Sequence, residues 1–371
     1  MDKRICVFGG TSLYRLPIYN QMAKELGCDF YLLQEESSAG IKSYNKEDLI
    51  NYRDTIHIDY KFGNFFWSKN VLRLIKFPYD VYVIGGAYWV TSWFLILLAR
   101  IHRKKIATWS HGLYGRESGF RRLVKKVFFK LADINFVYNN CAVKLMVQNG
   151  IPKEKVVCVG NSLDSDHDLC VRQKLVQTDL IKHHFGNDLP TLIFVGRVTN
   201  EKRLDLILLS MDILRKEGLH VNLIVVGKDV DGVNLEEVAA KLKLTDRLWM
   251  YGPCYDENII GELFYNSTVC VSPGNIGLTA ISSMTFGCPV ITHDDFNYQG
   301  PEYEAVIPGV TGDFFRRLDT VDLAEVIKRW TSEDVVGRRE DIRNACFNEV
   351  DAKWTIYSET KAFVNAFENL K

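Results

Sequence analysis

Residues 191–209 read TLIFVGRVTNEKRLDLILL, and this stretch decides how the second half of the chain is interpreted. The apolar run Leu192–Val195 is typical of a buried parallel strand, and Gly196 ends it. Two cations, Arg197 and Lys202, follow within a short turn, and apolar residues beyond the turn recur at helical spacing. A strand, a glycine, two cations and a helix in this order can hold a diphosphate. The alternative is an ordinary strand-to-helix turn with solvated cations.

A second glycine-rich turn favours the diphosphate interpretation. The strand predicted at Val269–Ser272 is followed by the turn Pro273-Gly274-Asn275-Ile276-Gly277-Leu278 and then by a helical pattern. Backbone N–H groups at a helix N-terminus bind phosphate, and α/β proteins bind ligands at the carboxyl ends of their parallel strands. Two such turns in one sheet therefore predict a diphosphate site, whereas the alternative is a capped helix with a glycine needed for packing.

The composition indicates a globular protein with two domains. The chain of 371 residues is longer than a single hydrophobic core ordinarily organises. It is 47% apolar and 25% charged, as is typical of a globular protein. The nine cysteines are scattered without a Cys-x-x-Cys pair, which argues against a disulfide framework and indicates a reducing compartment. The N-terminal sequence MDKRICVFGG enters a strand at once and shows no secretory signal, so we expect a cytoplasmic protein.

Charge is distributed unevenly between the two halves. Residues 1–160 contain 24 Lys and Arg against 13 Asp and Glu, a balance of +11, and the net charge of zero leaves −11 for the remainder. Such an asymmetry of charge between the two halves is evidence about binding partners and not about the fold. The basic half is expected to meet something anionic, and nucleic acid, an anionic membrane surface and a phosphorylated acceptor all qualify.

One uncharged run has the length of a membrane span. Val81–Ala99 contains no charged residue, but Gly85-Gly86 divides it into a strand-like part and a helix-like part, each too short to cross a bilayer. We therefore predict a buried strand followed by an apolar helix.

Residues 118–133, SGFRRLVKKVFFKLAD, predict a basic amphipathic helix. The face expected to pack on the sheet carries Phe120, Leu123, Val124, Val127, Phe128 and Leu131. The opposite face carries Arg121, Arg122, Lys125, Lys126 and Lys130. Such a face is typical of an element that lies on a membrane surface, and the alternative is a domain helix with a solvated basic face.

Strand and helix patterns alternate through both halves, which predicts parallel sheets covered by helices on both faces. Strands are predicted at Ile5–Phe8, Phe30–Leu33, His57–Asp59, Val81–Ile84, Ile106–Trp109, Ile134–Val137, Val156–Val159, Leu192–Val195, Val221–Val226, Leu248–Tyr251, Val269–Ser272 and Pro289–Thr292. From about Asp319 onward the pattern is helical, and Trp354, Tyr357, Phe363 and Phe367 are expected to anchor the last helix. The dinucleotide fingerprint G-x-G-x-x-G is absent, which weakens an oxidoreductase interpretation.

The chain resembles the GT-B glycosyltransferases of the large retaining family 4, many of which build bacterial polysaccharides. The matching motifs are FVGRVTNEKR at 194–203, SPGNIGLTAISSMTFGCPVI at 272–291 and PEYEAVIPGVTG at 301–312. Looser matches in the first half are Gly9-Gly10, Tyr14-Arg15-x-Pro17 and WSHG at 109–112.

The resemblance implies two Rossmann-like parallel-sheet domains that face each other across a cleft. An acceptor domain would comprise residues 1–165, a linker 166–189, a nucleotide-sugar domain 190–345, and a C-terminal helix, 346–371, would return to the first domain.

The resemblance also assigns roles to individual positions. The catalytic candidates are Arg197 and Lys202 on the donor diphosphate, His111 near the reaction centre, and Glu304. The donor-binding candidates are Gly196, Gly274, Asn275, Gly277, Leu278 and Ser282. The acceptor-side candidates are Gly9, Gly10 and Arg15.

The sequence departs from the family at the donor site. The family has two glutamates around the second turn, and Gly274 and Ser282 stand at those positions. Donor recognition is therefore expected to be rewired, with acids from the run His293-Asp294-Asp295, or Glu302 or Glu304, as substitutes. No cofactor or metal is assigned, because the Asp-x-Asp patterns at 164–166 and 229–231 are too short to indicate a site.

We expect a retaining glycosyltransferase that moves a sugar from a nucleotide-diphosphate donor to a glycan, with a lipid-linked acceptor in surface polysaccharide biosynthesis. The protein is expected in the cytoplasm, peripheral on the inner face of the membrane. The alternatives are a nucleotide-sugar epimerase or hydrolase of the same fold, and a non-catalytic protein that binds nucleotide or glycan. A nucleic-acid partner is not expected, because no RNA-binding pattern of aromatic and basic residues is present.

Overall fold

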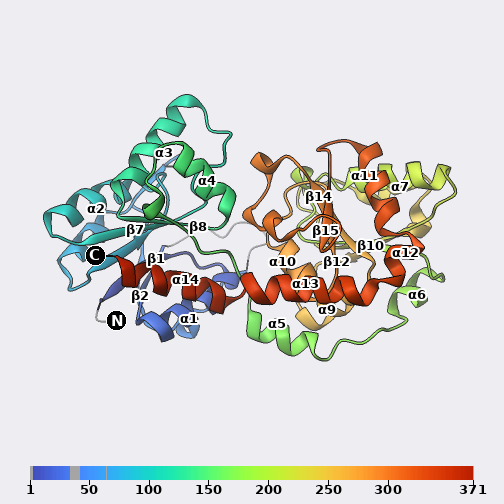
Figure 1. Cartoon of the computed structure of the whole chain (residues 1–371), viewed down its shortest axis with the longest axis horizontal. Coiled ribbons are helices and arrows are strands. Elements are labelled where there is room, and N and C mark those ends of the chain that lie inside the picture. The colour runs from blue at the N-terminus through green and yellow to red at the C-terminus, as the bar shows by residue number, and fades with distance from the viewer. Residues whose placement is uncertain (1–2, 34–41, 64, 371) are drawn as a thin grey trace. The chain divides into compact units, whose positions relative to one another are not determined.

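The computed structural model describes residues 3–33, 42–63 and 65–370, which form two compact units (Figure 1). The first unit comprises Met1–Asp164 with Thr355–Lys371, and the second comprises Ser165–Trp354. Each unit is built on its own parallel sheet, as the alternation of strand and helix patterns predicts. The expected fold class, α/β with two Rossmann-like sheets, is confirmed.

All neighbouring strands in the sheet of the first unit are parallel. In sheet order they are β3 (Tyr52–Ile56), β2 (Asp29–Leu33), β1 (Ile5–Gly9), β6 (Val81–Ile84), β7 (Lys105–Trp109), β8 (Ile134–Val137) and β9 (Val156–Cys158). A separate antiparallel hairpin is formed by β4 (Tyr60–Phe62) and β5 (Phe65–Trp67).

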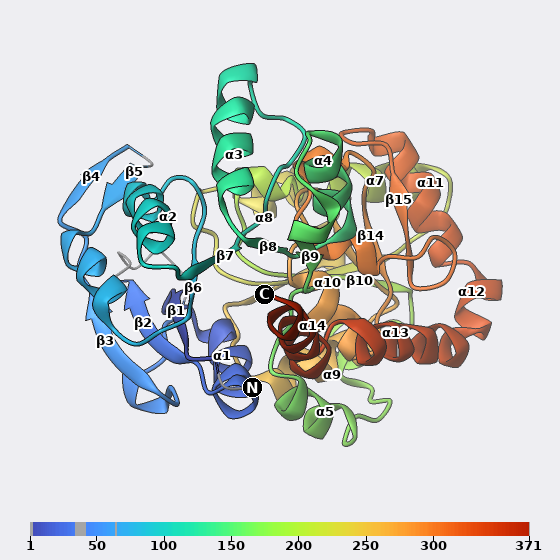
Figure 2. The ribbon, with the colours of Figure 1, turned by 60° about the vertical axis from the view of Figure 1, so that its left-hand side comes forward.

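Helices cover both faces of this sheet. They are α1 (Leu16–Leu26), α2 (Val90–Ile101), α3 (Gly119–Leu131), α4 (Asn140–Gln148) and α14 (Ile356–Asn369), with short 3₁₀ segments η1 (Leu13–Arg15), η2 (Lys46–Asp48), η3 (Lys69–Lys76) and η4 (Lys153–Lys155). One hydrophobic core joins the sheet to α1 and α14, and a second joins it to α2, α3, α4 and η3. Figure 2 shows these two helical layers on opposite sides of β1, β7 and β8.

The second unit repeats this plan. Its parallel strands, in sheet order, are β12 (Leu248–Gly252), β11 (Asn222–Val226), β10 (Thr191–Val195), β13 (Val269–Ser272), β14 (Val290–His293) and β15 (Gly312–Phe315). Its helices are α5 (Ser165–Arg172), α6 (Leu180–Phe185), α7 (Asp205–Lys216), α8 (Leu235–Lys241), α9 (Glu257–Asn266), α10 (Thr279–Thr285), α11 (Thr320–Trp330), α12 (Glu333–Gly337) and α13 (Arg339–Lys353). Its 3₁₀ segments are η5 (Asn200–Lys202), η6 (Thr245–Arg247), η7 (Phe296–Tyr298) and η8 (Pro301–Ala305).

Strand order reverses once in each sheet, and this determines where a ligand can bind. In the first unit the reversal lies between β1 and β6, and in the second between β10 and β13. Loops diverge to opposite faces at such a switch point and leave a crevice at the carboxyl ends of the strands. The glycine-rich stretches after β1, β10 and β13 all start at these positions.

The predicted strands are confirmed within one residue at each end, except at one edge of each sheet. The strand predicted at His57–Asp59 is wrong, because β3 ends at Ile56. The strand β15, with sequence GDFF, was not anticipated. Both are edge strands that contain polar residues, so neither produces the continuous apolar run of a central strand. The uncharged run Val81–Ala99 divides as predicted into β6 and most of α2.

The segments between and after the two sheets differ from the expected boundaries. Residues 166–189, expected as a linker, contain α5 and α6 and group with the second unit. The C-terminal segment contains a break, since α13 ends at Lys353 in the second unit and α14 begins at Ile356 in the first. A capping box between Thr355 and Ser358 starts α14.

Two phenylalanines hold α14 on the first sheet. Phe363 is fully buried, and its ring lies 4.5 Å from that of Phe136 and 4.8 Å from that of Trp109. Phe367 is also fully buried, beside Phe136. The expectation that Tyr357 is an anchor is wrong, because this side chain is exposed.

The orientation of α3 corrects the sequence interpretation. Phe120, Leu123 and Val127, expected on the sheet, are exposed. Lys125, expected on the solvated basic face, is buried and pairs with Glu117 at 2.8 Å. The side facing the core carries Phe128 and Phe129, so it is rotated from the face that the apolar pattern predicts. Among the described residues, no helix combines the length and hydropathy required to cross a bilayer.

We expect Phe363→Ala to lower the free energy of unfolding by about 3–5 kcal/mol, because it leaves a cavity between α14 and the sheet. Urea unfolding measures the change, and hydrogen–deuterium exchange should locate it in α14 and β8. Tyr357→Ala on the same helix is the matched control and should change stability by less than about 0.5 kcal/mol. Equal effects of the two substitutions would contradict the assignment of Phe363 as the anchor.

Candidate functional site

The predicted donor site lies at the switch point of the second sheet. Because β10 and β13 are neighbours, the turn after β10 and the turn after β13 begin side by side. Arg197 and Lys202 lie in the first of these turns, and Gly274 to Leu278 form the second. The structure therefore brings together the two stretches that the sequence singles out.

Glycine at 196 and 227 lets the chain turn closely past the neighbouring strand. The N–H of Gly196 donates to the carbonyl of Val226 at 2.9 Å. A Cβ atom on Gly227 would lie 1.8 Å from the carbonyl oxygen of Gly196, where no side chain fits. Gly196 has a φ of 148°, which a residue with a side chain adopts only with strain. This turn directs Arg197 outward, and its side chain is exposed.

Lys202 connects the two turns. Its ammonium group donates a hydrogen bond to the backbone carbonyl of Asn275. The pKa of Lys202 is lowered from 10.5 to about 8, mainly because burial disfavours the charged form and also because Arg197 is close. The negative charges of Glu302 and Glu201 oppose this shift. Two cations held this close repel each other, so an anion placed between them would be bound favourably.

Gly274 has no room for a side chain. A Cβ atom at this position would lie 2.1 Å from the carbonyl oxygen of Glu201 and 2.8 Å from the Cα of Lys202. The turn that carries Lys202 therefore occupies the space into which a glutamate at 274 would project. Among the residues of the second turn, Gly277 has a φ of 57°, so glycine is also favoured there.

The start of α10 follows this turn directly. Leu278 precedes the helix, and its carbonyl accepts from the N–H of Ser282 at 3.0 Å. Ser282 itself lies half-buried within α10. The hydroxyl of Thr279 donates to the carbonyl of Val195 at 3.0 Å, which attaches α10 to the end of β10.

Sequence reasoning missed the buried polar group that supports the second turn. The side-chain oxygen of Gln299 accepts from the N–H of Ile276 at 3.0 Å. Its amide nitrogen donates to the hydroxyl of Thr292 at 2.7 Å and to the carbonyl of His293 at 3.0 Å. The side-chain oxygen of Asn275 accepts from the N–H of Gly300 at 3.0 Å. A glutamine in a polar loop carries no local signal that marks it as buried.

Among the acids proposed as substitutes for the missing glutamates, Glu302 lies beside the second turn. Its side chain on η8 is buried, with 2% of its surface exposed. A Cβ atom on Gly300 would be 2.8 Å from a carboxylate oxygen of Glu302 and 2.9 Å from the side-chain oxygen of Asn275, so both oxygens lie close to Gly300. Glu304 is half-buried on the same short helix.

The other acids proposed as substitutes contact a different partner. The carboxylate of Asp294 accepts from the backbone N–H of Arg317 at 3.1 Å. Asp295 pairs with the guanidinium of Arg317 at 3.3 Å. The pKa of His293 is lowered from 6.5 to about 4 by burial and by the charge of Arg317.

The acceptor-side candidates lie at the switch point of the first sheet. Gly9 ends β1, and a Cβ atom there would lie 2.7 Å from the hydroxyl of Tyr19. Both backbone groups of Gly10 are engaged, since its N–H donates to Tyr19 at 3.2 Å and its carbonyl accepts from Tyr44 at 3.1 Å. These glycines permit close packing around the turn.

Arg15 and His111 meet around the ring of Tyr138. Arg15 donates to the hydroxyl of Tyr138 at 2.6 Å, and its guanidinium lies 4.9 Å from the ring centroid of Trp109. The ring of His111 lies 4.8 Å from that of Tyr138 and stacks on Tyr114. Loss of hydration, followed by the charges of Arg15 and Lys125, lowers the pKa of His111 from 6.5 to about 4. His111 is therefore neutral near pH 7 although the residue retains solvent exposure.

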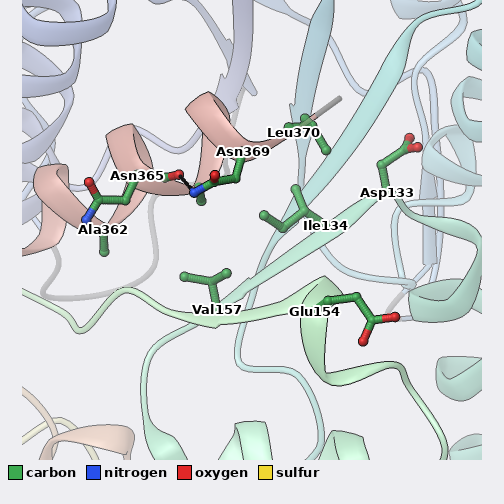
Figure 3. A pocket seen from close by; sticks show the side chains of 9 residues that line it. Asp133, Ile134, Glu154, Val157, Ala362, Asn365, Asn369 and Leu370 are labelled. Atoms are coloured by element: carbon green, nitrogen blue, oxygen red, sulfur yellow. Dashed lines mark hydrogen bonds between the residues drawn. The ribbon is translucent and has the colours of Figure 1, made fainter.

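The first unit also contains a pocket that is lined by none of the candidate site residues. It measures about 390 Å³ and lies where β8 and β9 begin, against the end of α14 (Figure 3). Its lining includes Asp133, Glu154 and Asn369. The carboxylate of Asp133 accepts a hydrogen bond from the N–H of Ile106 at 2.9 Å, so this side chain has a structural role at the edge of the pocket. The candidate residues instead lie at the carboxyl ends of the strands.

No group of three or more His, Cys, Asp or Glu side chains suited to a metal ion occurs within residues 3–33, 42–63 and 65–370. The expectation that no metal is used stays a prediction, as do the roles assigned to individual site residues.

Sequence comparison finds a likeness between the second unit and a known family. Residues 177–348 match the profile described as glycosyl transferases group 1. The chain is similar to a phosphatidylinositol N-acetylglucosaminyltransferase subunit of Arabidopsis thaliana, with 25% identity over 216 residues that cover 54% of this chain and 46% of that protein. It is also similar to the phosphatidylinositol N-acetylglucosaminyltransferase gpi3 subunit of Schizosaccharomyces pombe, with 22% identity over 321 residues, or 80% of this chain and 68% of that protein. The matched region thus spans about half the length of the Arabidopsis relative.

Structural comparison extends the likeness to both units. The crystal structure of Anabaena Alr3699/HepE in complex with UDP aligns with a TM-score of 0.75, and the alignment covers 98% of this chain and 99% of that chain. Sequence identity in this alignment is 13%, so the likeness shows a shared fold.

We expect the affinity for nucleoside diphosphates to fall as the pH rises through about 8, because Lys202 then loses its proton. A bound anion raises the pKa of Lys202, so binding above this pH must take up a proton, and affinity should fall by up to roughly tenfold per pH unit. Calorimetry with uridine diphosphate in buffers of different ionisation enthalpy measures both quantities.

Lys202→Met is the control for this titration, since it removes the ammonium and should flatten the pH dependence in this range. A pH dependence that survives the substitution would assign the titration to another group.

Proposed function

We propose that this chain, whose residues 177–348 match the profile of glycosyl transferases group 1 and whose two units share the fold of a UDP-bound structure, transfers a sugar from a nucleotide-diphosphate donor to a glycan hydroxyl. The proposed reaction retains the anomeric configuration, and the acceptor is a lipid-linked oligosaccharide of surface polysaccharide biosynthesis. The observation that carries this proposal is the pair of cations, Arg197 and Lys202, at the switch point of the second sheet.

The two cations suit a reaction in which the leaving group is an anion. As the bond between the sugar C1 and the phosphate oxygen breaks, negative charge grows on the diphosphate, and Arg197 and Lys202 would stabilise it. The acceptor oxygen bonds to C1, and its proton leaves with the diphosphate. Because the ammonium of Lys202 is partly desolvated and already oriented by Asn275, little reorganisation is needed during the reaction.

The donor-binding carboxylate is proposed to come from Glu302. The space beside Gly274 is filled by the turn that carries Lys202, so this position cannot provide an acidic side chain. Glu302 lies near Asn275 and within the electrostatic reach of Lys202. A carboxylate accepts hydrogen bonds from sugar or ribose hydroxyls, which is the function proposed for Glu302.

The acceptor is proposed to bind at the crevice of the first unit. Arg15 presents a cation there, and the neutral imidazole of His111 can accept a proton or a hydrogen bond from a hydroxyl. Both relatives found by sequence are named for transfer to phosphatidylinositol, a lipid, which supports a lipid-linked acceptor.

We expect Lys202→Ala to lower turnover by roughly 100-fold to 1,000-fold, because the leaving diphosphate loses a preorganised cation. Release of uridine diphosphate from uridine-diphosphate sugars, with and without glycan acceptor, measures the reaction. Release that needs no acceptor would indicate hydrolysis in place of transfer.

Lys328→Ala removes an exposed lysine on α11 that pairs with Glu217, and it is the matched control. It should leave turnover unchanged. If Lys202→Ala and Lys328→Ala behaved alike, the diphosphate assignment would fail.

We expect Glu302→Gln to raise the donor KM by roughly 10-fold to 100-fold, because a hydrogen bond to a charged group is replaced by a weaker neutral one. Initial rates at varied donor concentration test this, and a thermal melt confirms that the buried substitution leaves the fold intact. Glu325→Gln, at an exposed position on α11, should leave the KM unchanged. A normal KM in folded Glu302→Gln would place the donor carboxylate elsewhere.

A further inference from the structure

Two neighbouring helices of the first unit expose apolar stripes. On α2, Phe94, Leu97 and Ile101 are exposed, and Ile101 has 74% of its surface accessible. On α3, Phe120, Leu123 and Val127 are exposed, and Phe120 reaches 77%. Both sets follow the spacing i, i+3, i+7, so each forms one continuous stripe along its helix. We refer to these six residues as the α2–α3 surface.

The two stripes belong to one layer of the unit. The helices α2 and α3 contribute to the same core on one face of the sheet, and Figure 2 shows them on the same side of β7. The ring of Trp93 on α2 lies 5.0 Å from that of Phe128 on α3. The guanidinium of Arg100, at the end of α2, donates to the carbonyl of Leu131 at 3.1 Å. These contacts place the two helices side by side, and the residues of both stripes remain exposed.

The β4–β5 hairpin extends this surface beyond α2. Trp67 of β5 contacts Phe94 with ring centroids 5.1 Å apart. Near the tip of the hairpin, Phe62 has 86% of its surface exposed, and Tyr60 is also exposed. Exposed apolar patches of this kind, bordered by polar residues, mark binding sites for membranes or proteins.

The segment that contains both helices is strongly basic. Residues 88–132 contain ten Lys and Arg and one acidic residue, Glu117. Glu117 is bound internally by Lys125 at 2.8 Å, so it does not offset the exposed cations. Arg121, Arg122 and Lys130 are exposed on α3 beside the apolar stripe.

We propose that the α2–α3 surface and the β4–β5 hairpin bind the face of an anionic lipid bilayer, with the apolar side chains inserted between headgroups and the cations on the lipid phosphates. In an anionic bilayer, negatively charged headgroups lie above the acyl chains. Apolar stripes bordered by Lys and Arg match this arrangement, because the apolar side chains can reach the acyl chains while the cations contact the headgroups. Nucleic acid would account for the cations but leave the aliphatic stripes of both helices exposed. This binding requires neither donor nor acceptor, so it is independent of the proposed transfer reaction.

The proposal is tested by cosedimentation of the full chain with vesicles of phosphatidylcholine, with or without added phosphatidylglycerol. We expect binding to the anionic vesicles and at least roughly tenfold weaker binding to the neutral ones, decreasing further as salt is raised. Leu97→Ser/Leu123→Ser and Arg121→Gln/Arg122→Gln should each weaken binding by roughly tenfold or more. All four side chains are exposed, so these substitutions should leave the thermal melt unchanged.

Matched controls lie away from this surface. Val321→Ser changes an exposed apolar residue on α11, and Lys24→Gln changes an exposed cation on α1, which covers the opposite face of the first sheet. Both should bind vesicles like the unsubstituted protein.

Two results would overturn the proposal. One is binding that is equal for neutral and anionic vesicles, or equal for the variants and the controls. The other is absence of vesicle binding together with a dimer that Leu97→Ser/Leu123→Ser dissociates in sedimentation velocity, which would assign the surface to a second copy of the chain.

Discussion

The constraint on which the second unit depends is the direct contact of two backbone turns at the switch point of its sheet. The turn after β10 lies so close to Gly274 that no side chain can stand between them, and Lys202 fixes the contact by bonding to the carbonyl of Asn275. Glycine at 274 is a consequence of this approach, whereas Gly227 is required by a separate approach to the carbonyl of Gly196. The same approach buries the ammonium of Lys202, which lowers its pKa, and the nearby charge of Arg197 lowers the pKa further.

This contact also limits which side chains the proposed donor site can contain. A glutamate at 274 and the observed course of the Lys202 turn exclude each other for steric reasons. A carboxylate does lie near the second turn, on the short helix η8, where Glu302 is buried near Gly300 and Asn275. The absence of an acidic side chain at 274 is therefore consistent with the donor-binding function proposed for Glu302.

For helix α3, the apolar pattern predicts the helix correctly but predicts the wrong side of it to face the core. The pattern identifies an amphipathic helix, and the helix is present. The sheet, however, takes up Phe128 and Phe129, and the pair Lys125–Glu117 becomes buried, because α2 and the loop after β7 complete the packing on that side. The apolar stripe of Phe120, Leu123 and Val127 is consequently left to solvent. Periodicity defines a stripe, but it does not say which surface the stripe contacts.

The sequence by itself determined the central strands, the helices between them and the two glycine-rich turns, because these follow from continuous apolar runs and from residues adjacent in the chain. It did not identify β3 and β15, because both strands contain polar residues and neither forms a continuous apolar run. Only the tertiary structure decided the burial of Gln299, the approach of Glu302 to the second turn and the orientation of α3. Each of these depends on contacts between segments far apart in the sequence, and no local pattern encodes such contacts.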